Sequence, residues 1–261
     1  RVSLVGSEMC IRDREWKISP GASAQDDIQS AMILAQEGDT IALTAGVYNL
    51  NHGLSLDVDN IILKGEGHKK TILNFSEQKT GAQGLLVTSN NITLRDFAVE
   101  NAKGDAIKSK GSKNIKFLNL RTEWTNGPDT KNGAYGLYPV ESKNVLIDGC
   151  VAIGASDAGV YVGQSENIIV RNTEAYFNVA GIEIENSYYA DVYDNVAENN
   201  TAGILVFDLP DLPKQGGKFV RVFNNISSNN NTENFAPEGN IVGQVPKAVS
   251  YTHLRAHETH S

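Results

Sequence analysis

Apolar residues recur at every second position in many short segments of this chain, for example Asn167–Arg171 (NIIVR) and Gly181–Glu185 (GIEIE). Such alternation is typical of a β-strand with one buried face. Gly, Asn and Asp separate the segments, and these residues favour tight turns and the left-handed backbone conformation. The pattern therefore predicts many short strands joined by tight corners.

The strands and corners repeat along the chain with a nearly constant period. The residue after each NIIVR-like strand is Asp96, Asn119, Gly149, Asn172, Asn195 or Asn225, and the residue that opens each GIEIE-like strand is Gly84, Ala106, Gly136, Gly159, Gly181 or Gly203. Most steps in both series are 22 or 23 residues. This period predicts an all-β solenoid of parallel strands, because a leucine-rich repeat of similar length needs regularly spaced leucines that are missing here.

Stacked coils of such a solenoid place equivalent residues about 4.8 Å apart. The alignment predicts one inward column of Leu94, Phe117, Ile147, Val170, Tyr193 and Phe223, and a second of Phe97, Leu120, Cys150, Thr173, Val196 and Ile226. Asn119, Asn172, Asn195 and Asn225 are predicted to form a corner ladder whose amides bond from coil to coil. Cys150 is interpreted as a small core residue and not as a nucleophile.

With this repeat, the chain resembles the right-handed parallel β-helix superfamily, which includes pectate lyases, polygalacturonases and alginate epimerases. The resemblance covers Glu15 to Pro246 and implies a right-handed single-stranded parallel β-helix with a polysaccharide partner. The segment AYGLYPVES (134–142) is similar to the epimerase segment around Tyr-Gly-x-Asp-Pro-His, but Tyr138 and Val140 replace its Asp and His. The resemblance therefore does not imply epimerase activity for this chain. Whether the chain is an enzyme stays open.

Residues 15–247 are expected to form one β-helix domain. Within it, Ser23–Gln36 predicts a helix with Ile28, Met32 and Ala35 on one face, ended by Gly38 and covering the N-terminal end of the solenoid. Residues 1–14 and 248–261 lack the repeat and look like translated sequencing-adapter sequence, so they are expected to lie outside the domain. The β-helix itself is expected to be truncated on its C-terminal side.

The charge balance narrows the choice of partners. The chain has 31 acidic and 23 basic residues and a net charge of −8, which gives no reason to expect a nucleic-acid or membrane-surface partner. No segment approaches the roughly 20 apolar residues of a membrane span. We expect a monomer without membrane insertion, and the family resemblance implies a secreted, periplasmic or cell-surface location.

Two insertions flank the GIEIE-like strands, and they point to a functional face. Trp124–Lys131 comes just before the strand in its coil, and Leu209–Gly217 comes just after it. Long loops in a compact fold are often functional. We therefore expect the two insertions to border the outward face of these strands, where Glu183 and Glu185 lie two residues apart. Their spacing of about 6.5–7 Å is near the acid–base separation of inverting glycosidases, which makes them candidate catalytic residues.

The same face offers candidate substrate-binding residues: Trp124, Tyr138, Tyr161, Lys108 and Asp208. Exposed aromatic rings stack on sugar rings, and a lysine can neutralise a uronate. Each residue also has a purely structural interpretation: a solvated strand face for the glutamates, an aromatic ladder for the tyrosines, solubility for the lysine and a turn for the aspartate.

No metal-ligand set is evident in the sequence, and a divalent cation such as Ca²⁺ stays open as a cofactor. The predicted function is an extracytoplasmic protein that binds polysaccharide and modifies it as a lyase, epimerase or hydrolase. The alternative is a non-catalytic glycan-binding or structural cell-surface repeat protein.

Overall fold

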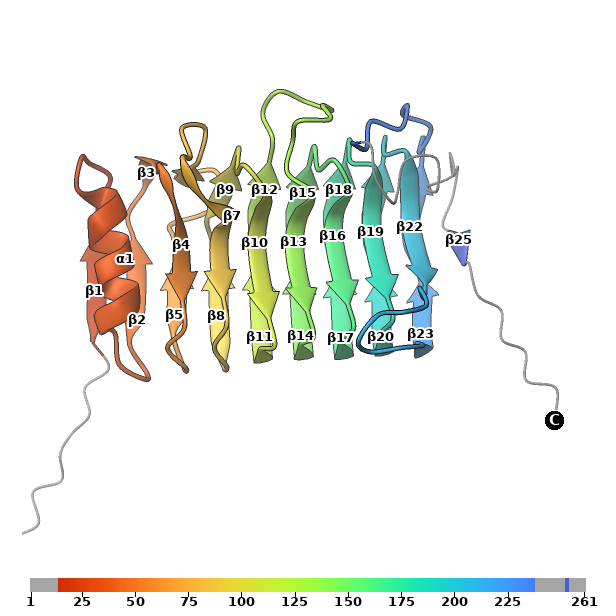
Figure 1. Ribbon diagram of the computed structural model, residues 1–261, viewed down its shortest axis with the longest axis horizontal. Helices are drawn as coiled ribbons and strands as arrows, with labels where there is room; N and C mark the ends of the chain where they lie inside the picture. Colours follow the sequence, from red (N-terminus) through yellow and green to blue (C-terminus); the bar gives the residue numbers. More distant parts are fainter. Residues whose placement is uncertain (1–13, 238–251, 254–261) are drawn as a thin grey trace, which may run out of the picture.

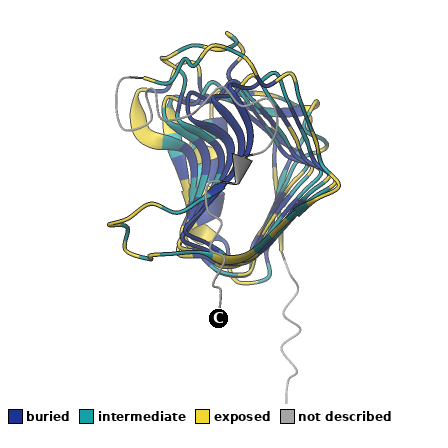
Figure 2. Ribbon diagram, turned by 90° about the vertical axis from the view of Figure 1, so that its right-hand side faces the viewer, coloured by how far each residue is buried: buried dark blue, intermediate teal, exposed yellow. Residues whose placement is uncertain are grey.

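The computed structural model describes residues 14–237 and 252–253, and it confirms the predicted parallel β-helix. The chain winds through three sheets in turn, and every strand pairs in parallel with its equivalent one coil away (Figure 1). Figure 2 looks along the coil and shows the successive turns superposed. The period of 22 or 23 residues therefore corresponds to one turn of three short strands.

Each sheet takes one strand from each complete turn. Sheet 1 consists of β1 (Glu15–Ile18), β2 (Thr40–Leu43), β5 (Ile62–Lys64), β8 (Ile92–Arg95), β11 (Lys113–Leu118), β14 (Lys143–Asp148), β17 (Glu166–Arg171), β20 (Tyr188–Tyr193) and β23 (Lys218–Phe223). Sheet 2 consists of β3 (Gly46–Asn49), β6 (Thr71–Asn74), β9 (Ala98–Glu100), β12 (Arg121–Glu123), β15 (Val151–Ile153), β18 (Glu174–Tyr176), β21 (Val196–Glu198) and β24 (Ile226–Ser228). Sheet 3 consists of β4 (His52–Leu56), β7 (Thr80–Val87), β10 (Asp105–Lys110), β13 (Tyr135–Val140), β16 (Ala158–Gly163), β19 (Ala180–Glu185), β22 (Ala202–Phe207) and β25 (Thr252–His253).

The core is a continuous apolar column inside the coil, and it corrects the predicted register in the last two turns. Val170 pairs with Val192, and Val192 pairs with Val222, so these valines fill the inward positions predicted for Tyr193 and Phe223. The two aromatic rings instead stack on each other with centroids 5.0 Å apart, and Phe223 is exposed. A one-residue shift moves every side chain of a strand to the other face, which is why the prediction placed these rings inside.

The corner after sheet 1 shows the same one-residue shift. The left-handed residues there are Asp96, Asn119, Gly149, Asn172, Asp194 and Asn224, with φ between 49° and 66°. Asn195 therefore points inward in place of Val196, and its Oδ1 accepts the backbone N–H of Thr173 at 3.0 Å. Asn225 does the same for the backbone N–H of Asn195 at 3.0 Å. The predicted Asn ladder is thus divided in two. Asn119 and Asn172 adopt the left-handed conformation at the outer corner, whereas Asn195 and Asn225 point inward and accept hydrogen bonds from backbone N–H groups.

A second ladder fixes the corner that leads into sheet 3. Asn178 and Asn200 are fully buried, and Asn178 Nδ2 donates to Asn200 Oδ1 at 2.9 Å. Asn200 Nδ2 donates in turn to Asn230 Oδ1 at 3.0 Å. Because the buried amides also bond to backbone groups of neighbouring coils, for example to the carbonyl of Ala152 at 3.1 Å, they hold the start of the sheet 3 strands in place.

Helix α1 (Ala24–Leu34) covers the N-terminal end of the coil, as the sequence predicts (Figure 1). Its buried face consists of Ala24, Ile28, Ala31 and Met32. The helix ends at Leu34, so Gly38 is not its cap. Gly38 instead lies in the turn before β2, with a φ of 92°. Its backbone N–H donates a hydrogen bond to the carbonyl of Asn60 at 3.0 Å.

Three residues of the expected terminal segments contact the β-helix. Arg14 donates its backbone N–H to Asp39 at 2.9 Å and accepts a hydrogen bond from the N–H of Thr40. Thr252 and His253 form β25, which pairs in parallel with β22. The remaining residues of both segments lie outside the described part of the chain.

Candidate functional site

The outer face of sheet 3 carries the predicted columns of site residues. Lys108 pairs with Tyr138, and Tyr161 pairs with Glu183. Gly163 pairs with Glu185 in the next outward column. The sequence therefore assigned the register of this face correctly in these coils.

The first insertion borders the start of these strands, but Trp124 is not exposed as the sequence predicted. Trp124 was expected to be exposed for contact with sugar, yet it is 4% exposed. Its indole N–H donates to the carbonyl of Ala102 at 2.7 Å, and a side chain at Gly133 would meet its ring at 2.6 Å. Trp124 fixes the insertion to the β-helix, because its ring is buried and its indole N–H has a hydrogen-bond acceptor.

The second insertion borders the other end of the same strands. Asn186, at the end of β19, donates its side-chain amide to the carbonyls of Leu209 and Lys214 at 2.9 and 3.1 Å. Lys214 also reaches back one more coil, where its backbone N–H donates to Gln164 at 3.3 Å. The loop is therefore fixed along the edge of sheet 3 over two coils. Asp208, which immediately precedes it, is partly buried.

Three tyrosines form one aromatic cluster on this face. The ring centroid of Tyr135 lies 4.5 Å from that of Tyr138 and 4.7 Å from that of Tyr161, and the last two lie 4.9 Å apart edge to face. Tyr161 is 5% exposed, so it is not the open stacking platform that was expected. Tyr135 and Tyr138 are partly exposed and supply the accessible part of the cluster.

Glu183 and Glu185 are almost completely buried, contrary to the expected solvated strand face. Glu183 is 4% exposed, and no described residue forms a hydrogen bond or ion pair with it. Burial, together with the charges of Asp157 and Glu185, raises the pKa of Glu183 well above its usual range. Glu185 is 7% exposed and accepts a hydrogen bond from Tyr161 at 2.9 Å. Burial raises the pKa of Glu185, while the bond from Tyr161 opposes that rise.

Asp157 and Asp105 join these glutamates in one acidic cluster. Asp157 is 8% exposed and hydrogen-bonds to Tyr135. Burial raises the pKa of Asp157 to about 6, with smaller contributions from the charges of Glu185 and Asp105. Burial also raises the pKa of Asp105, against the opposing effect of Lys108. Asp157 is therefore influenced by Asp105 on one side, and it shares an electrostatic environment with Glu183 and Glu185 on the other.

Lys108 is already engaged with a protein carboxylate. Its ammonium lies 3.5 Å from Asp105 and 4.3 Å from the centroid of the Tyr138 ring. Burial raises the pKa of Tyr138 to about 12, and the charge of Asp105 adds to that rise. The lysine thus balances Asp105 within the cluster instead of standing free for a uronate.

Asp105 and Tyr135 were not predicted as site residues from the sequence. The repeat nevertheless indicated them, because Asp105 and Tyr135 occupy equivalent positions, just before Ala106 and Gly136 and at the start of β10 and β13. In the following coils this position is alanine, at Ala158, Ala180 and Ala202. These alanines form an outer apolar cluster with Tyr161 and Leu205. A third outward column was therefore readable from the repeat.

In the described part of the chain, no group of three or more His, Cys, Asp or Glu side chains is arranged to hold a metal ion. The cluster is thus made of carboxyl and phenol groups with one ammonium. Such a set can donate and accept protons and can bind hydroxyl groups.

Other polar regions have their charges balanced locally. A hollow of about 500 Å³ lies over sheet 1, away from the acidic cluster, and its lining includes Lys64, which pairs with Glu15 at 2.6 Å, and Arg95, which pairs with Asp96 at 2.5 Å. Because its cations are matched by neighbouring acids, this hollow has no excess of either charge for a ligand.

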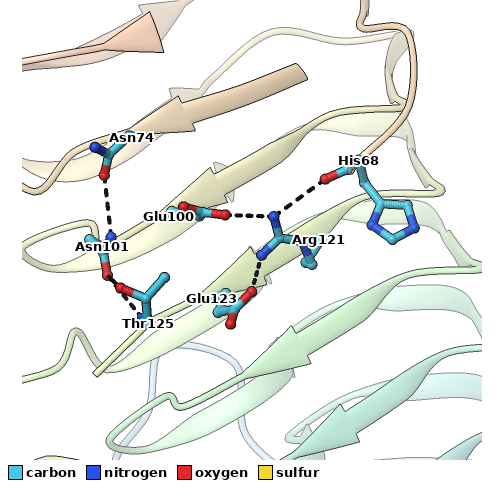
Figure 3. Close-up of polar contacts among 7 residues, drawn as sticks. All are labelled: His68, Asn74, Glu100, Asn101, Arg121, Glu123 and Thr125. Atoms are coloured by element: carbon cyan, nitrogen blue, oxygen red, sulfur yellow. Dashed lines mark hydrogen bonds and ion pairs between the residues drawn. The ribbon is translucent and has the colours of Figure 1, made fainter. Parts of the chain in front are cut away.

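On sheet 2, Arg121 lies between Glu100 and Glu123 and also donates to the carbonyl of His68 (Figure 3). Nearby, Asn101 accepts hydrogen bonds from the backbone and hydroxyl of Thr125, at the base of the first insertion. This network has a structural explanation, since it fixes the root of the loop that borders sheet 3.

Comparison with known families identifies the fold class. Residues 59–211, more than half of the chain, match the family described as "Right handed beta helix region", so the chain belongs to this family. The coil is therefore right-handed, as expected for parallel strands joined by crossovers. A comparison with curated proteins gives no match.

Solved structures with the same fold include three with distant sequences. Pectate lyase Pel9A has a TM-score of 0.57 at 14% identity, with 87% of this chain and 82% of that chain covered. The N-terminal fragment of bacteriophage Phi29 gene product 12 has a TM-score of 0.62 at 16% identity, with 80% and 42% covered. A rhamnogalacturonan lyase has a TM-score of 0.54 at 13% identity, with 81% and 62% covered. At these identities the likeness shows the fold alone.

Proposed function

We propose that the protein binds polysaccharide across the outer face of sheet 3 and cleaves it by acid–base catalysis. The observation that carries this proposal is one face of sheet 3 on which Asp157, Glu183 and Glu185 lie beside a cluster of three tyrosines, with an insertion at each end of the sheet's strands. Sugar rings present C–H faces that pack on aromatic rings and hydroxyl groups that bind carboxylates. The pectate lyase and rhamnogalacturonan lyase neighbours make a polysaccharide the first ligand to test.

The two glutamates have different environments, and this difference suggests their roles. Burial and its acidic neighbours raise the pKa of Glu183, which suits a proton donor to the leaving oxygen. Glu185 is held by Tyr161 in the form that accepts a hydrogen bond, which suits a base. Neighbouring outward positions of one strand lie about 6.5–7 Å apart, within the range of inverting glycosidases. Inverting hydrolysis is therefore the reaction class that we propose.

The proposal places the protein outside the cytoplasm, in a secreted, periplasmic or cell-surface location, where polysaccharides of this kind are met. In the described residues no helix is both long enough and apolar enough to cross a bilayer.

A second candidate is glycan binding without cleavage. It is favoured by the low exposure of Glu183 and Glu185, because a catalytic pair must reach the glycosidic oxygen. In this alternative the carboxyl groups only hold hydroxyl groups at the edge of the tyrosine cluster.

Both candidates can be tested on the full chain with a glycan array, followed by titration calorimetry and product analysis. Catalysis predicts that Glu183→Gln and Glu185→Gln each remove turnover while the affinity changes by less than about threefold. Binding alone predicts no product with the unmodified protein and a loss of affinity in both variants. Absence of binding to every glycan would reject the site.

A further inference from the structure

We propose that the polysaccharide is uncharged where it crosses the tyrosine and carboxyl cluster of sheet 3, so that a polyuronate is not its ligand. This inference rests on the proposed function and narrows it to a class of substrate. It follows from the balance of charge around the cluster.

The cluster contains four carboxyl groups and one lysine. The lysine, Lys108, lies 3.5 Å from Asp105, which leaves Asp157, Glu183 and Glu185 without a cationic partner among the described residues. Each of these three side chains is less than 9% exposed, so water screens their charges poorly. Asp157 and Glu185 each accept a hydrogen bond from a tyrosine and have no cation beside them, so a ligand that enters here meets a negative potential.

Neighbouring cations do not offset this potential. Lys110, on the same strand as Lys108, lies 3.8 Å from Glu141. Lys214, in the second insertion, places its ammonium 3.4 Å from the carbonyl of Ser165 and over the ring of Tyr188. Lys108, Lys110 and Lys214 therefore each have an acid or another acceptor of their own. In the first insertion, Lys131 is exposed, so solvent and salt screen its charge.

The environment of Glu183 shows that the cluster disfavours a further negative charge. It is buried without a hydrogen-bond donor among the described residues, and its ionisation is opposed by burial and by Asp157 and Glu185. The carboxylate of a uronate would face the same opposition. The hydroxyl groups of an uncharged sugar can instead donate to these carboxyl oxygens, and its C–H faces can pack on Tyr135 and Tyr138.

Matched polysaccharides test this directly. Hexasaccharides of polygalacturonate and of polymannuronate would each be compared with their carboxyl-reduced forms, which keep the linkage and lose the charge. Titration calorimetry on the full chain at pH 7, with a chelator present, should show about tenfold tighter binding of the reduced member in each pair that binds, as expected for one uncompensated charge near a poorly screened site.

Charge-removing variants provide a second measurement. Asp157→Asn and Glu185→Gln should strengthen binding of the acidic member severalfold and leave the reduced member less affected, so that the ratio within a pair falls. Glu174→Gln removes the same charge from an exposed position on sheet 2, and the ratio should not change.

Three results would overturn the inference. The first is equal or tighter binding of the acidic member in the presence of chelator. The second is a preference for the acidic member that appears on addition of Ca²⁺ and disappears in Asp157→Asn, which would show a cation bridging the carboxylates. The third, no binding of any member of any pair or of any glycan on the array, would reject the proposed function as well, whereas the first two reject the substrate class alone.

Discussion

The hydroxyl group of Tyr161 donates a 2.9 Å hydrogen bond to Glu185, a residue of the next coil. The ring reaches that position by lying across Gly163 of its own strand, where a Cβ atom would come within 2.3 Å of the hydroxyl oxygen. A glycine in the outward column thus makes room for a contact between two coils.

Gly163→Ala should displace the Tyr161 ring and break its bond to Glu185. Overpacking of this kind costs about 1–3 kcal/mol, which urea unfolding would measure. In a Tyr161→Ala background the obstructing ring is gone, so the same substitution should cost far less. Equal costs in both backgrounds would contradict the proposed contact. Gly21→Ala is a control, since no atom lies within 4 Å of the added carbon.

Asp157→Asn should change how stability depends on pH. Burial raises the pKa of Asp157 to about 6 in the folded state, above its ordinary value of 3.8. The folded protein therefore binds the proton more tightly, and the stability present below pH 4 is lost as the pH rises through 6. One pKa unit corresponds to about 1.4 kcal/mol. The free energy of unfolding of the variant, relative to that of the wild type, should therefore increase by about 1–3 kcal/mol as the pH is raised from 4 to 8.

Asp148→Asn is the matched control for that experiment and should behave in the opposite way. Burial alone would raise the pKa of Asp148, but hydrogen bonds from Asn172 and Arg171 lower it overall. Its contribution to stability is present above the unfolded-state pKa and is lost in acid, so this variant should lose stability at neutral pH. If the free energies of unfolding of both variants, measured in urea, changed in the same direction with pH, the opposite pKa shifts assigned to Asp157 and Asp148 would be contradicted.

Val170→Asp should unfold the protein or cost several kcal/mol, because it places an unpaired charge between Ile147 and Val192 in the core. Ile169→Asp, one residue earlier, is the control. Ile169 is exposed on the outer face, so the same substitution should change the free energy of unfolding by less than about 1 kcal/mol. Thermal melting of the two variants measures the difference, and similar melting temperatures would refute the inward assignment.

Trp124→Ala should destabilise the protein by about 3–5 kcal/mol through loss of a buried ring. Trp124→Phe keeps most of the packing and removes only the bond to Ala102, so it should cost about 1–3 kcal/mol. Glycan affinity measured below the melting temperature should be the same for the Phe variant as for wild type. A large loss of affinity with unchanged stability would show that Trp124 contacts the ligand after all.

The sequence by itself determined the repeat, two of the three strands of each turn, the helix over the N-terminal end and the outward columns of sheet 3. These follow from local alternation and turn residues, which repeat in every coil. The register of the last two coils was not determined, because Asp194 and Asn195 are adjacent polar residues and either can occupy a left-handed corner. The structure places Asn195 inside, where its amide satisfies the backbone of Thr173.

Only the tertiary structure decided which outward residues are buried and which converge. Alternation tells that Glu183 points away from the core, but not that the outer face around it is covered. It likewise could not show that Trp124 turns under its loop to reach Ala102. Asp157 influences the pKa of Glu183, and Asp105 that of Asp157, because coils stack about 4.8 Å apart, which brings residues more than 20 positions apart in sequence into one electrostatic environment. The chemistry of the site therefore depends on contacts between coils, whereas the fold depends on the pattern within each one.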